Sequence, residues 1–172
     1  MGILGGNPKD NPLHYGEVFD VWSFSSKAKL SLSCYQAYLN HAGDSDLKAV
    51  LRDLIDQAKM EIKECDTLIL GNGLAPAPAL PERPEAKAEE IPVGARFADQ
   101  EIAAHIAADT SMGLVACSQA MGMSTREDIG ALFAKYHATK TTLGTRILRM
   151  TKEKGWLIPP PLHVETPELV EA

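Results

Sequence analysis

The segment that decides the fold is LAPAPALPERPEAKAEEIPVGARF, residues 74–97. Prolines recur along it, and a proline inside a helix removes a main-chain hydrogen bond and clashes with the preceding turn. In the polyproline II form, at about 3.1 Å per residue, a segment of this length could span well over about 60 Å. A helix of about 28 residues is only about 42 Å long. The segment is therefore long enough to return along the whole length of a helical bundle.

Two proline-free stretches precede this segment and two follow it. In each of them apolar or small residues recur at helical spacing. The pattern predicts helices over about residues 13–42, 44–72, 98–123 and 125–154. Polar residues stand where caps are wanted, so Asp44 or Ser45 is expected to cap the second helix, and Ser124 or Thr125 the fourth.

The lengths of the connections predict how these helices are arranged. Only a few residues join the first helix to the second and the third to the fourth, so each of these pairs must be antiparallel. The crossover over residues 74–97 lets the third helix run parallel to the second. We therefore predict an all-α fold, a ferritin-like four-helix bundle with a long Pro-rich crossover between helices 2 and 3.

Size and composition limit the class of protein. A chain of 172 residues suits one compact domain and is short for two, so residues 1–172 are expected to form a single bundle domain with an extended tail over 156–172. The net charge of −6 argues against nucleic acid as a partner, because no general basic field would attract it. No apolar run reaches the roughly 18 to 20 residues that cross a bilayer, so no membrane span is expected.

The cysteines indicate a compartment. Cys34, Cys65 and Cys117 are dispersed through predicted helices and form neither a CxxC motif nor a Cys/His metal spacing. An odd number of cysteines in apolar surroundings is typical of reduced, buried thiols. We expect a cytoplasmic protein.

Polar residues interrupt the apolar seams of all four predicted helices at one level. Alternating steps of three and four residues place Ser25, Glu61, Asp109 and Lys140 in seam positions. A rise of about 1.5 Å per residue puts all four within roughly 10 Å of one another along the bundle axis. His137 lies one turn before Lys140, at the level of Glu61.

Three interpretations of this layer stay open. Some of the side chains could face solvent, if the seams are displaced by a residue. Alternatively, Lys140 neutralises buried Glu61 and Asp109, with Ser25 in the same layer and His137 as a hydrogen-bond partner, because a buried charge is tolerated only when it is paired. In the third interpretation, Glu61, Asp109 and His137 bind a single divalent metal such as zinc.

The layer does not match the oxygen-activating di-iron bundles. Those need a Glu-x-x-His pair from each of two helices. The predicted second helix offers Glu61 with Glu64 in place of the histidine, and the fourth offers Ala134 with His137. Both pairs are broken, and neither a nucleophile beside a base nor a phosphate-binding glycine motif occurs. We therefore predict no catalytic residues, no enzyme activity and no cofactor.

The predicted third helix is rich in small residues, which lie on more than one of its sides. They are Ala103, Ala104, Ala107, Ala108, Gly113, Ala116, Ala120 and Gly122. A core-facing seam explains about half of them, and the rest leave a smooth surface that another helix could approach closely. This suggests a homodimer through helix 3. Alanine is also simply a good helix former, which is the competing interpretation.

Three stretches carry a resemblance to a known family. They are APALPERP at residues 77–84, FADQEIA at 97–103 and KGWLIPPP at 154–161. Over nearly its whole length the chain resembles a Bacillus-type family of unknown function related to spore coat protein F. The resemblance implies a ferritin-like bundle and a link to endospore formers, and it implies no established reaction.

These observations lead to two hypotheses of different classes. The leading one is a spore-associated structural or interaction protein that is not an enzyme, with other coat proteins as partners and the spore coat as a second location besides the cytoplasm. The alternative is a metal-binding or small-ligand-binding ferritin-like protein that uses the mid-bundle polar layer.

Overall fold

Four long helices account for most of the chain in the computed structural model, which describes residues 11–161 and residue 163. They are α1 (Tyr15–His41), α2 (Ser45–Gly71), α3 (Asp99–Met123) and α4 (Glu127–Glu153). Two short 3-10 turns, η2 (Ala88–Glu90) and η3 (Val93–Ala95), lie in the crossover. The described residues contain no strand, and each helix lies within three residues of its predicted limits. The predicted all-α fold is confirmed.

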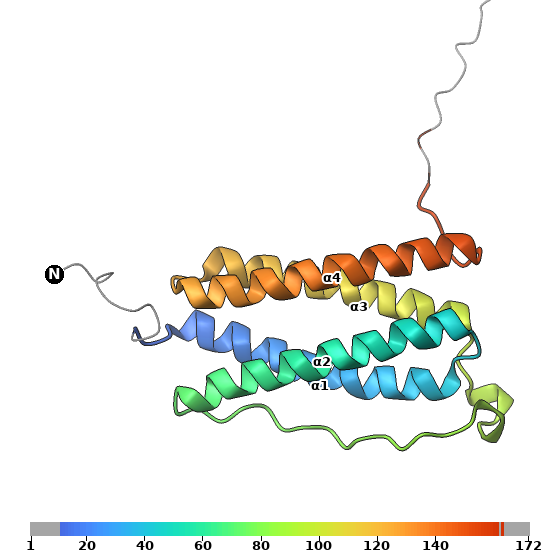
Figure 1. Ribbon diagram of the computed structural model, residues 1–172, viewed down its shortest axis with the longest axis horizontal. Helices are drawn as coiled ribbons and strands as arrows, with labels where there is room; N and C mark the ends of the chain where they lie inside the picture. Colours follow the sequence, from blue (N-terminus) through green and yellow to red (C-terminus); the bar gives the residue numbers. More distant parts are fainter. Residues whose placement is uncertain (1–10, 162, 164–172) are drawn as a thin grey trace, which may run out of the picture.

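The crossover sets the directions of the helices. Figure 1 shows it running the length of the bundle, from the end of α2 to the start of α3, so that these two helices point the same way. α1 packs mainly on α2 and α3 mainly on α4, with smaller contacts between α1 and α3 and between α2 and α4. All four packed pairs are therefore antiparallel. The predicted four-helix bundle with one long crossover between the second and third helices is confirmed.

A row of polar side chains on α1 holds the crossover against the bundle. Lys29 Nζ donates a hydrogen bond to the carbonyl oxygen of Ala77 at 2.5 Å. One turn further on, the carbonyl oxygen of Ser33 accepts from Arg83 Nε at 3.0 Å. The row continues with Gln36, whose side chain accepts from Arg83 N, and Asn40, whose side chain bonds to Pro84 and Ala86. The proline-rich segment therefore gains its fixed path from helix side chains, since it forms no regular main-chain ladder of its own.

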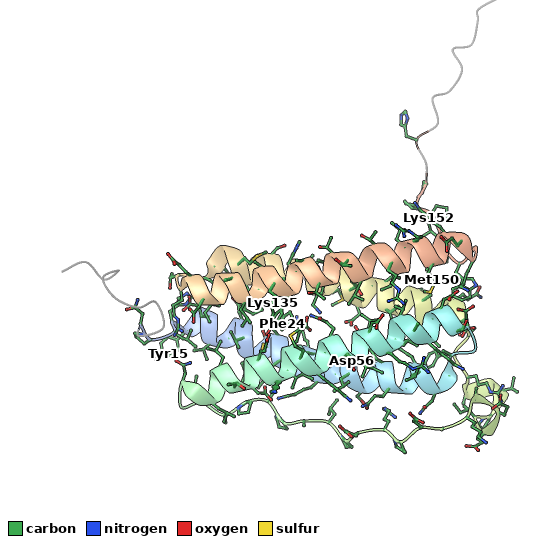
Figure 2. All side chains as sticks on the ribbon, viewed as in Figure 1. Tyr15, Phe24, Asp56, Lys135, Met150 and Lys152 are labelled. Carbon is green, nitrogen blue, oxygen red and sulfur yellow. The ribbon has the colours of Figure 1, made fainter. Side chains whose placement is uncertain are left out.

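The interior divides into two apolar clusters at opposite halves of the bundle. Figure 2 labels Met150, which belongs to one cluster, and Phe24, which belongs to the other. The first is mainly aliphatic and contains Leu47, Leu51, Ile102, Ile106 and Ile147 among others. The second centres on the packed rings of Phe24, Phe133 and Tyr136. Polar groups at mid-height lie between them, where the sequence predicts a polar layer.

Carboxylates from neighbouring helices close the two short turns. Glu17 of α1 is almost fully buried, and its Oε1 accepts hydrogen bonds from Thr125 N at 2.7 Å and Arg126 N at 2.9 Å, in the turn between α3 and α4. Asp99 of α3 accepts from Gly43 N at 2.8 Å and Asp44 N at 2.9 Å, in the turn between α1 and α2. Each helical hairpin is thus capped by the other hairpin.

Two predicted caps have different outcomes. Asp44 caps α2 as expected, accepting from Asp46 N at 2.9 Å and Leu47 N at 3.0 Å. The prediction that Ser124 or Thr125 caps α4 is wrong. Arg126 occupies the cap position, and its side chain makes no capping bond because a guanidinium group has no acceptor. Glu17 of α1 instead binds the main-chain N–H groups of Thr125 and Arg126 in the turn before the helix.

The ends of the chain are described only in part. Of the tail predicted over 156–172, residues 156–161 and residue 163 are described, and 162 and 164–172 lie outside the described residues. Residues 1–10 also lie outside the described residues. Trp156 packs partly against the aliphatic cluster, whereas Ile158 is 88% exposed.

Candidate functional site

Glu61 of α2 and Lys140 of α4 form an ion pair across the middle of the bundle. The side chain of Glu61 is 2% exposed and that of Lys140 is 17% exposed, with Lys140 Nζ at 2.9 Å from Glu61 Oε1 and 3.0 Å from Oε2. Gln57, one turn earlier on α2, donates to Oε1 at 2.9 Å. The structure therefore brings two of the predicted layer residues together, and a third side chain completes their hydrogen bonding.

Gly113 of α3 makes room for the lysine side chain. A Cβ atom at this position would lie 2.9 Å from Lys140 Cδ and 3.1 Å from its Cε. The aliphatic stem of Lys140 thus passes against the main chain of α3, and its ammonium group also lies 5.4 Å from the ring centre of Phe24. In the sequence Gly113 is one of many small residues of this helix. In the structure its missing Cβ leaves the space through which Lys140 reaches Glu61.

Asp109 belongs to a different pair. Tyr35 Oη donates a hydrogen bond to Asp109 Oδ2, which joins α1 to α3. Burial raises the pKa of Tyr35, and the negative charge of Asp109 raises it further, so the hydroxyl keeps its proton and acts as a neutral donor. The hypothesis that Lys140 neutralises both Glu61 and Asp109 is thus replaced by two separate pairs.

Ser25 and His137 also lie apart from the Glu61 and Lys140 pair. Ser25 Oγ donates to Asp66 Oδ1 at 2.6 Å, and Lys29 Nζ lies 2.7 Å from Asp66 Oδ2, so Ser25 belongs to a cluster that faces the crossover. His137 is half-buried, and its ring makes no hydrogen bond to any residue that the structure describes. A shift of one residue turns a side chain by about 100° around a helix, so equal height does not ensure contact.

The predicted metal ligands do not converge. Among residues 11–161 and 163, no group of three His, Cys, Asp or Glu side chains is arranged to hold a metal ion, and Glu61, Asp109 and His137 are therefore not brought together. The physical reason is that Glu61 is engaged by Lys140, whereas Asp109 is engaged by Tyr35.

A pocket of about 590 Å³ opens between α1 and α3. Both the Glu61 and Lys140 pair and the Tyr35 and Asp109 pair line it. Glu61, Gln57 and Lys140 lie at its depth, and Tyr35 and Asp109 form part of its wall. Its mouth carries exposed side chains, and its apolar lining includes Phe24, Ala28, Leu54, Ala58 and Ala116. Charged and polar groups from four helices therefore meet one apolar cavity, and this is the candidate site.

Sequence reasoning missed two residues of this site. The hydrophobic spacing of α1 accounts for Tyr35 as a core residue and does not predict that its hydroxyl binds a carboxylate. Gln57 was missed as well, although its position one turn before Glu61 is a signal that could have found it. Both supply neutral donors to carboxylates, and the seam pattern ranks residues by hydrophobicity rather than by hydrogen-bonding capacity.

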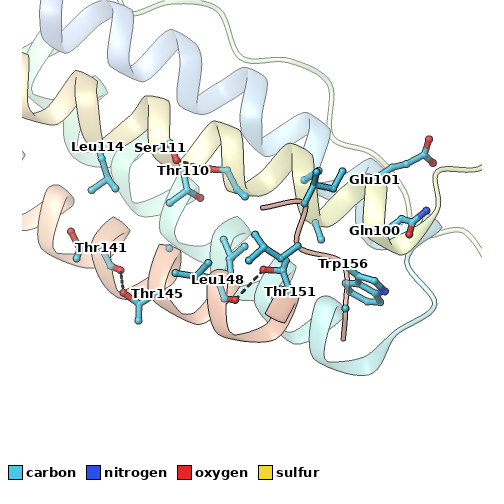
Figure 3. Close-up of a pocket in the computed structure, with 18 residues that line it drawn as sticks. Gln100, Glu101, Thr110, Ser111, Leu114, Thr141, Thr145, Leu148, Thr151 and Trp156 are labelled. Atoms are coloured by element: carbon cyan, nitrogen blue, oxygen red, sulfur yellow. Dashed lines mark hydrogen bonds between the residues drawn. The ribbon is translucent and has the colours of Figure 1, made fainter. Parts of the chain in front are cut away.

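A second groove, of about 810 Å³, lies between α3 and α4 beside the start of the tail. Figure 3 shows its lining, which includes Thr110, Ser111, Thr145 and Thr151. Each of these four hydroxyl groups donates to a main-chain carbonyl of its own helix. The one charged residue among those that line it, Glu101, is exposed, so this groove lacks a buried charged pair like the one that lines the pocket between α1 and α3.

The cysteines are free, as the spacing suggests. Cys65 and Cys117 are buried and Cys34 is half-buried. Burial raises the pKa of the Cys65 thiol to about 12, and that of Cys117 to about 12 as well. A thiol that stays protonated is a poor nucleophile, so these two cysteines are packing residues.

The fold and the site define a four-helix-bundle protein with a side pocket over an internal ion pair. The family model described as "Protein of unknown function (DUF3231)" matches residues 1–169, and the chain belongs to this family. It is 50% identical over 165 residues to "Uncharacterized protein YvdQ" of Bacillus subtilis (strain 168), which covers 96% of this chain and 97% of the relative.

A solved structure extends the comparison. The chain is 45% identical to a "putative spore coat protein" of Bacillus halodurans C-125, whose crystal structure matches with a TM-score of 0.90 over 92% of this chain and all of that one. The family relationship and a neighbour with a spore-coat name agree with the resemblance found in the sequence. In the described part of the chain, no helix is both long and apolar enough to cross a membrane.

Proposed function

We propose that this chain is a spore-associated structural or interaction protein, built on a ferritin-like bundle and without catalytic activity. The observation that carries the proposal is the 45% identity to a "putative spore coat protein" over 92% of the chain. The buried charges support a structural role, since Glu61 is neutralised by Lys140 and Glu17 is saturated by main-chain donors. Such internal pairing fixes packing and register.

The proposed interaction begins with a homodimer through α3, and we propose that part of α1 belongs to the same surface. Phe19 and Leu30 of α1 and Met112, Val115 and Met123 of α3 are all more than half exposed. Phe19 and Leu30 are three turns apart on one face of α1. We call these five side chains the apolar ribbon, and an apolar ribbon of this length is unusual on a surface with no partner.

The antiparallel packing of α1 and α3 favours a second copy as the occupant. A two-fold axis across this helix pair would place each ribbon on its own equivalent, which is how most dimer interfaces are built. Gly113 and Ala116 of α3 lie between the flanking apolar side chains and line the pocket there, so a partner helix meets no bulky side chain from these two positions. Other coat proteins are proposed as further partners of the dimer.

Localisation tests the proposal directly. A fluorescent fusion of the chain is expressed in a sporulating Bacillus, and the signal is expected to gather around the developing spore and to extract with the coat fraction. The same fusion carrying Phe19→Glu and Met112→Glu is the matched variant, and it is expected to lose much of that signal. A signal spread evenly through the cytoplasm at every stage would sink the spore-coat part of the proposal.

Light scattering after size-exclusion chromatography tests the dimer. The unchanged chain is expected to elute as a dimer and the Phe19→Glu and Met112→Glu variant as a folded monomer, because charges at both sites oppose burial of the ribbon. Leu148→Glu, at an exposed position on α4, is the control and should stay dimeric. A monomer of the unchanged chain at about 100 μM, well above the Kd of a stable dimer, would contradict this surface.

We propose further that the chain works without a resident cofactor. Purification without chelator, followed by metal analysis, is expected to give far less than one iron, manganese or zinc ion per chain. Stoichiometric metal that is lost in Glu61→Ala would contradict this, and it would favour the metal-binding alternative.

The second candidate function is small-ligand binding in the pocket between α1 and α3. One observation favours it: the apolar cavity of about 590 Å³ has charged groups in its wall and floor, the pattern typical of small-molecule sites. Titration with small molecules that differ in the charge of their head group tests this candidate function.

A further inference from the structure

The pocket between α1 and α3 holds one negative charge that its own residues do not neutralise. Glu61 and Lys140 cancel each other within the ion pair. Asp109 receives a hydrogen bond from the neutral hydroxyl of Tyr35 through Oδ2 alone. No Lys, Arg or His among the described residues forms an ion pair with Asp109, and its side chain lines the cavity while half-buried. A carboxylate in that position attracts a cation.

Most of the remaining surface of the pocket is apolar, although Ser31, Ser111 and Gln119 also line it. Phe24, Ala28 and Ala58 are buried, and they lie beside the ion pair from α1 and α2. A cavity of about 590 Å³ lies within the range of about 300 to 1,000 Å³ that holds small organic ligands. The pocket therefore suits an occupant whose apolar part is larger than its polar part.

The charges at the mouth do not favour an anion. Lys27 is exposed at the mouth, where solvent and salt screen its charge. Lys140 lies deeper, and both oxygens of Glu61 already engage it. An anionic head group would thus meet Asp109 without a free buried cation, which costs free energy.

We infer that this pocket binds a small cationic amphiphile, with a protonated amine against Asp109 and an apolar chain among Phe24, Ala28 and Ala58. The inference deepens the ligand-binding candidate and rests on it. It is separate from the spore-coat proposal, because localisation does not require an occupied pocket. It is coupled to the proposed dimer, because Leu30, Met112 and Val115 of the apolar ribbon also line the pocket.

Calorimetric titration with three probes of equal chain length tests the inference. n-Decylamine, n-decanol and decanoate share one apolar chain and differ only in head group, and each is used below the concentration at which it aggregates. We expect the amine to bind at least about tenfold more tightly than the other two, the value of one hydrogen-bonded charge pair. Absence of binding by the amine, or tighter binding by decanoate, would overturn the inference.

Two variants assign the roles within the pocket. Asp109→Asn should remove the preference for the amine and leave decanol binding unchanged, whereas Asp56→Asn, at an exposed position on α2, is the control and should change neither. Ala116→Leu fills part of the cavity and should weaken all three probes. If Asp109→Asn fails to fold, the Ala116→Leu variant still tests the inference. Decylamine binding as tight in Ala116→Leu as in the unchanged chain would mean that the amine binds outside this pocket, which would overturn the inference.

A short amine separates the head group from the chain. n-Butylamine offers the same ammonium group with six fewer CH₂ groups to bury, and should bind at least about a hundredfold more weakly. Equal affinity for butylamine and decylamine would overturn the apolar half of the inference. Titrating a variant with Phe19→Glu and Met123→Glu, two ribbon residues that do not line the pocket, keeps the outcomes apart, since amine binding in a monomeric variant shows that the pocket acts without the dimer.

Discussion

At one end of the bundle Glu17 of α1 closes the turn between α3 and α4, and at the other Asp99 of α3 closes the turn between α1 and α2. Both carboxylates accept two main-chain N–H groups from the opposite hairpin. They differ in depth, because Glu17 is 1% exposed and Asp99 is half-buried. The same hydrogen bonds are therefore made in two different dielectric environments.

The surroundings of the two carboxylates sharpen the contrast. At the Glu17 end, Arg126 is also buried and holds Asp128 and the carbonyl oxygen of Asn11. At the Asp99 end, the nearby ion pairs of Lys154 with Asp44 and Asp46 lie near the surface. The comparison teaches that one end is fixed by buried hydrogen bonds, whose loss leaves polar groups unpaired. The other end relies on interactions that water can replace.

The largest expected effect comes from Glu17→Ala. It leaves three main-chain donors, those of His14, Thr125 and Arg126, and the side chain of Thr125 without their acceptor, so the free energy of unfolding should fall by about 2 to 4 kcal/mol. Chemical denaturation monitored by circular dichroism measures it. Glu127→Ala, an exposed carboxylate in the first turn of α4, is the matched control and should change stability by less than about 1 kcal/mol. A similarly small loss for Glu17→Ala would remove the contrast between the ends.

The second prediction concerns acid. Burial alone would raise the pKa of Glu17, but hydrogen bonds from the main chain of Arg126, His14 and Thr125 outweigh it and hold the pKa below its ordinary value of 4.5. A lowered folded-state pKa gives stability that is complete above about 4.5 and is lost as pH falls through the folded value.

Glu17→Gln should therefore flatten the acid branch of the stability curve below pH 4.5. At neutral pH it should cost about 1 to 2 kcal/mol, because the amide keeps one acceptor and turns a donor toward His14 N. Unfolding free energies from pH 3 to pH 7, about the range of carboxylate titration, measure both effects. An acid branch as steep as that of the unchanged chain would assign the acid sensitivity to other carboxylates.

The third change, Asp99→Ala, should cost about 1 kcal/mol, the usual value of a capping carboxylate with access to water. Water can reach Gly43 N and Asp44 N once the carboxylate is gone. Denaturation beside the control Glu89→Ala, an exposed residue of η2, checks the value. A loss as large as that of Glu17→Ala would show that the two ends are equivalent despite their different burial.

The smallest effect is expected from Lys154→Gln. Hydrogen bonds to Asp44 and Asp46 raise the pKa of Lys154, so the lysine is charged at neutral pH, but its pairs are open to solvent. The difference in melting temperature from the unchanged chain should be small at low salt and should disappear in about 1 M salt, where the Debye length is about 3 Å. A difference that persists at high salt would mean that this pair acts through packing against Trp156 instead.

The fold could be predicted from the sequence because its signals are local. Prolines exclude a helix over most of residues 74–97 wherever that segment lies, and the periodicity of the flanking stretches is a property of each helix alone. The cap at Asp44 is local as well. The contact of Glu17 with the turn before α4 is not local, since Glu17 lies 108 residues from Thr125 in the sequence, and no spacing pattern predicts it.

The site could be predicted only in part. Glu61 and Lys140 were placed together because both occupy seams at the same height on α2 and α4. Asp109 was assigned to the wrong partner, since its height alone does not show that it faces Tyr35 on α1. Ser25 was placed in the layer by the same reasoning, and it instead meets Asp66.

By itself the sequence determined four helices, their antiparallel pairing and the presence of polar residues at mid-bundle. These follow from spacing, from the length of connections and from the geometry of proline. Only the tertiary structure decided which polar groups meet and which pocket they line, because that depends on the rotation of each helix and the reach of each side chain. Gly113 shows the reason most clearly, since the value of its missing Cβ appears only once Lys140 from another helix lies across it.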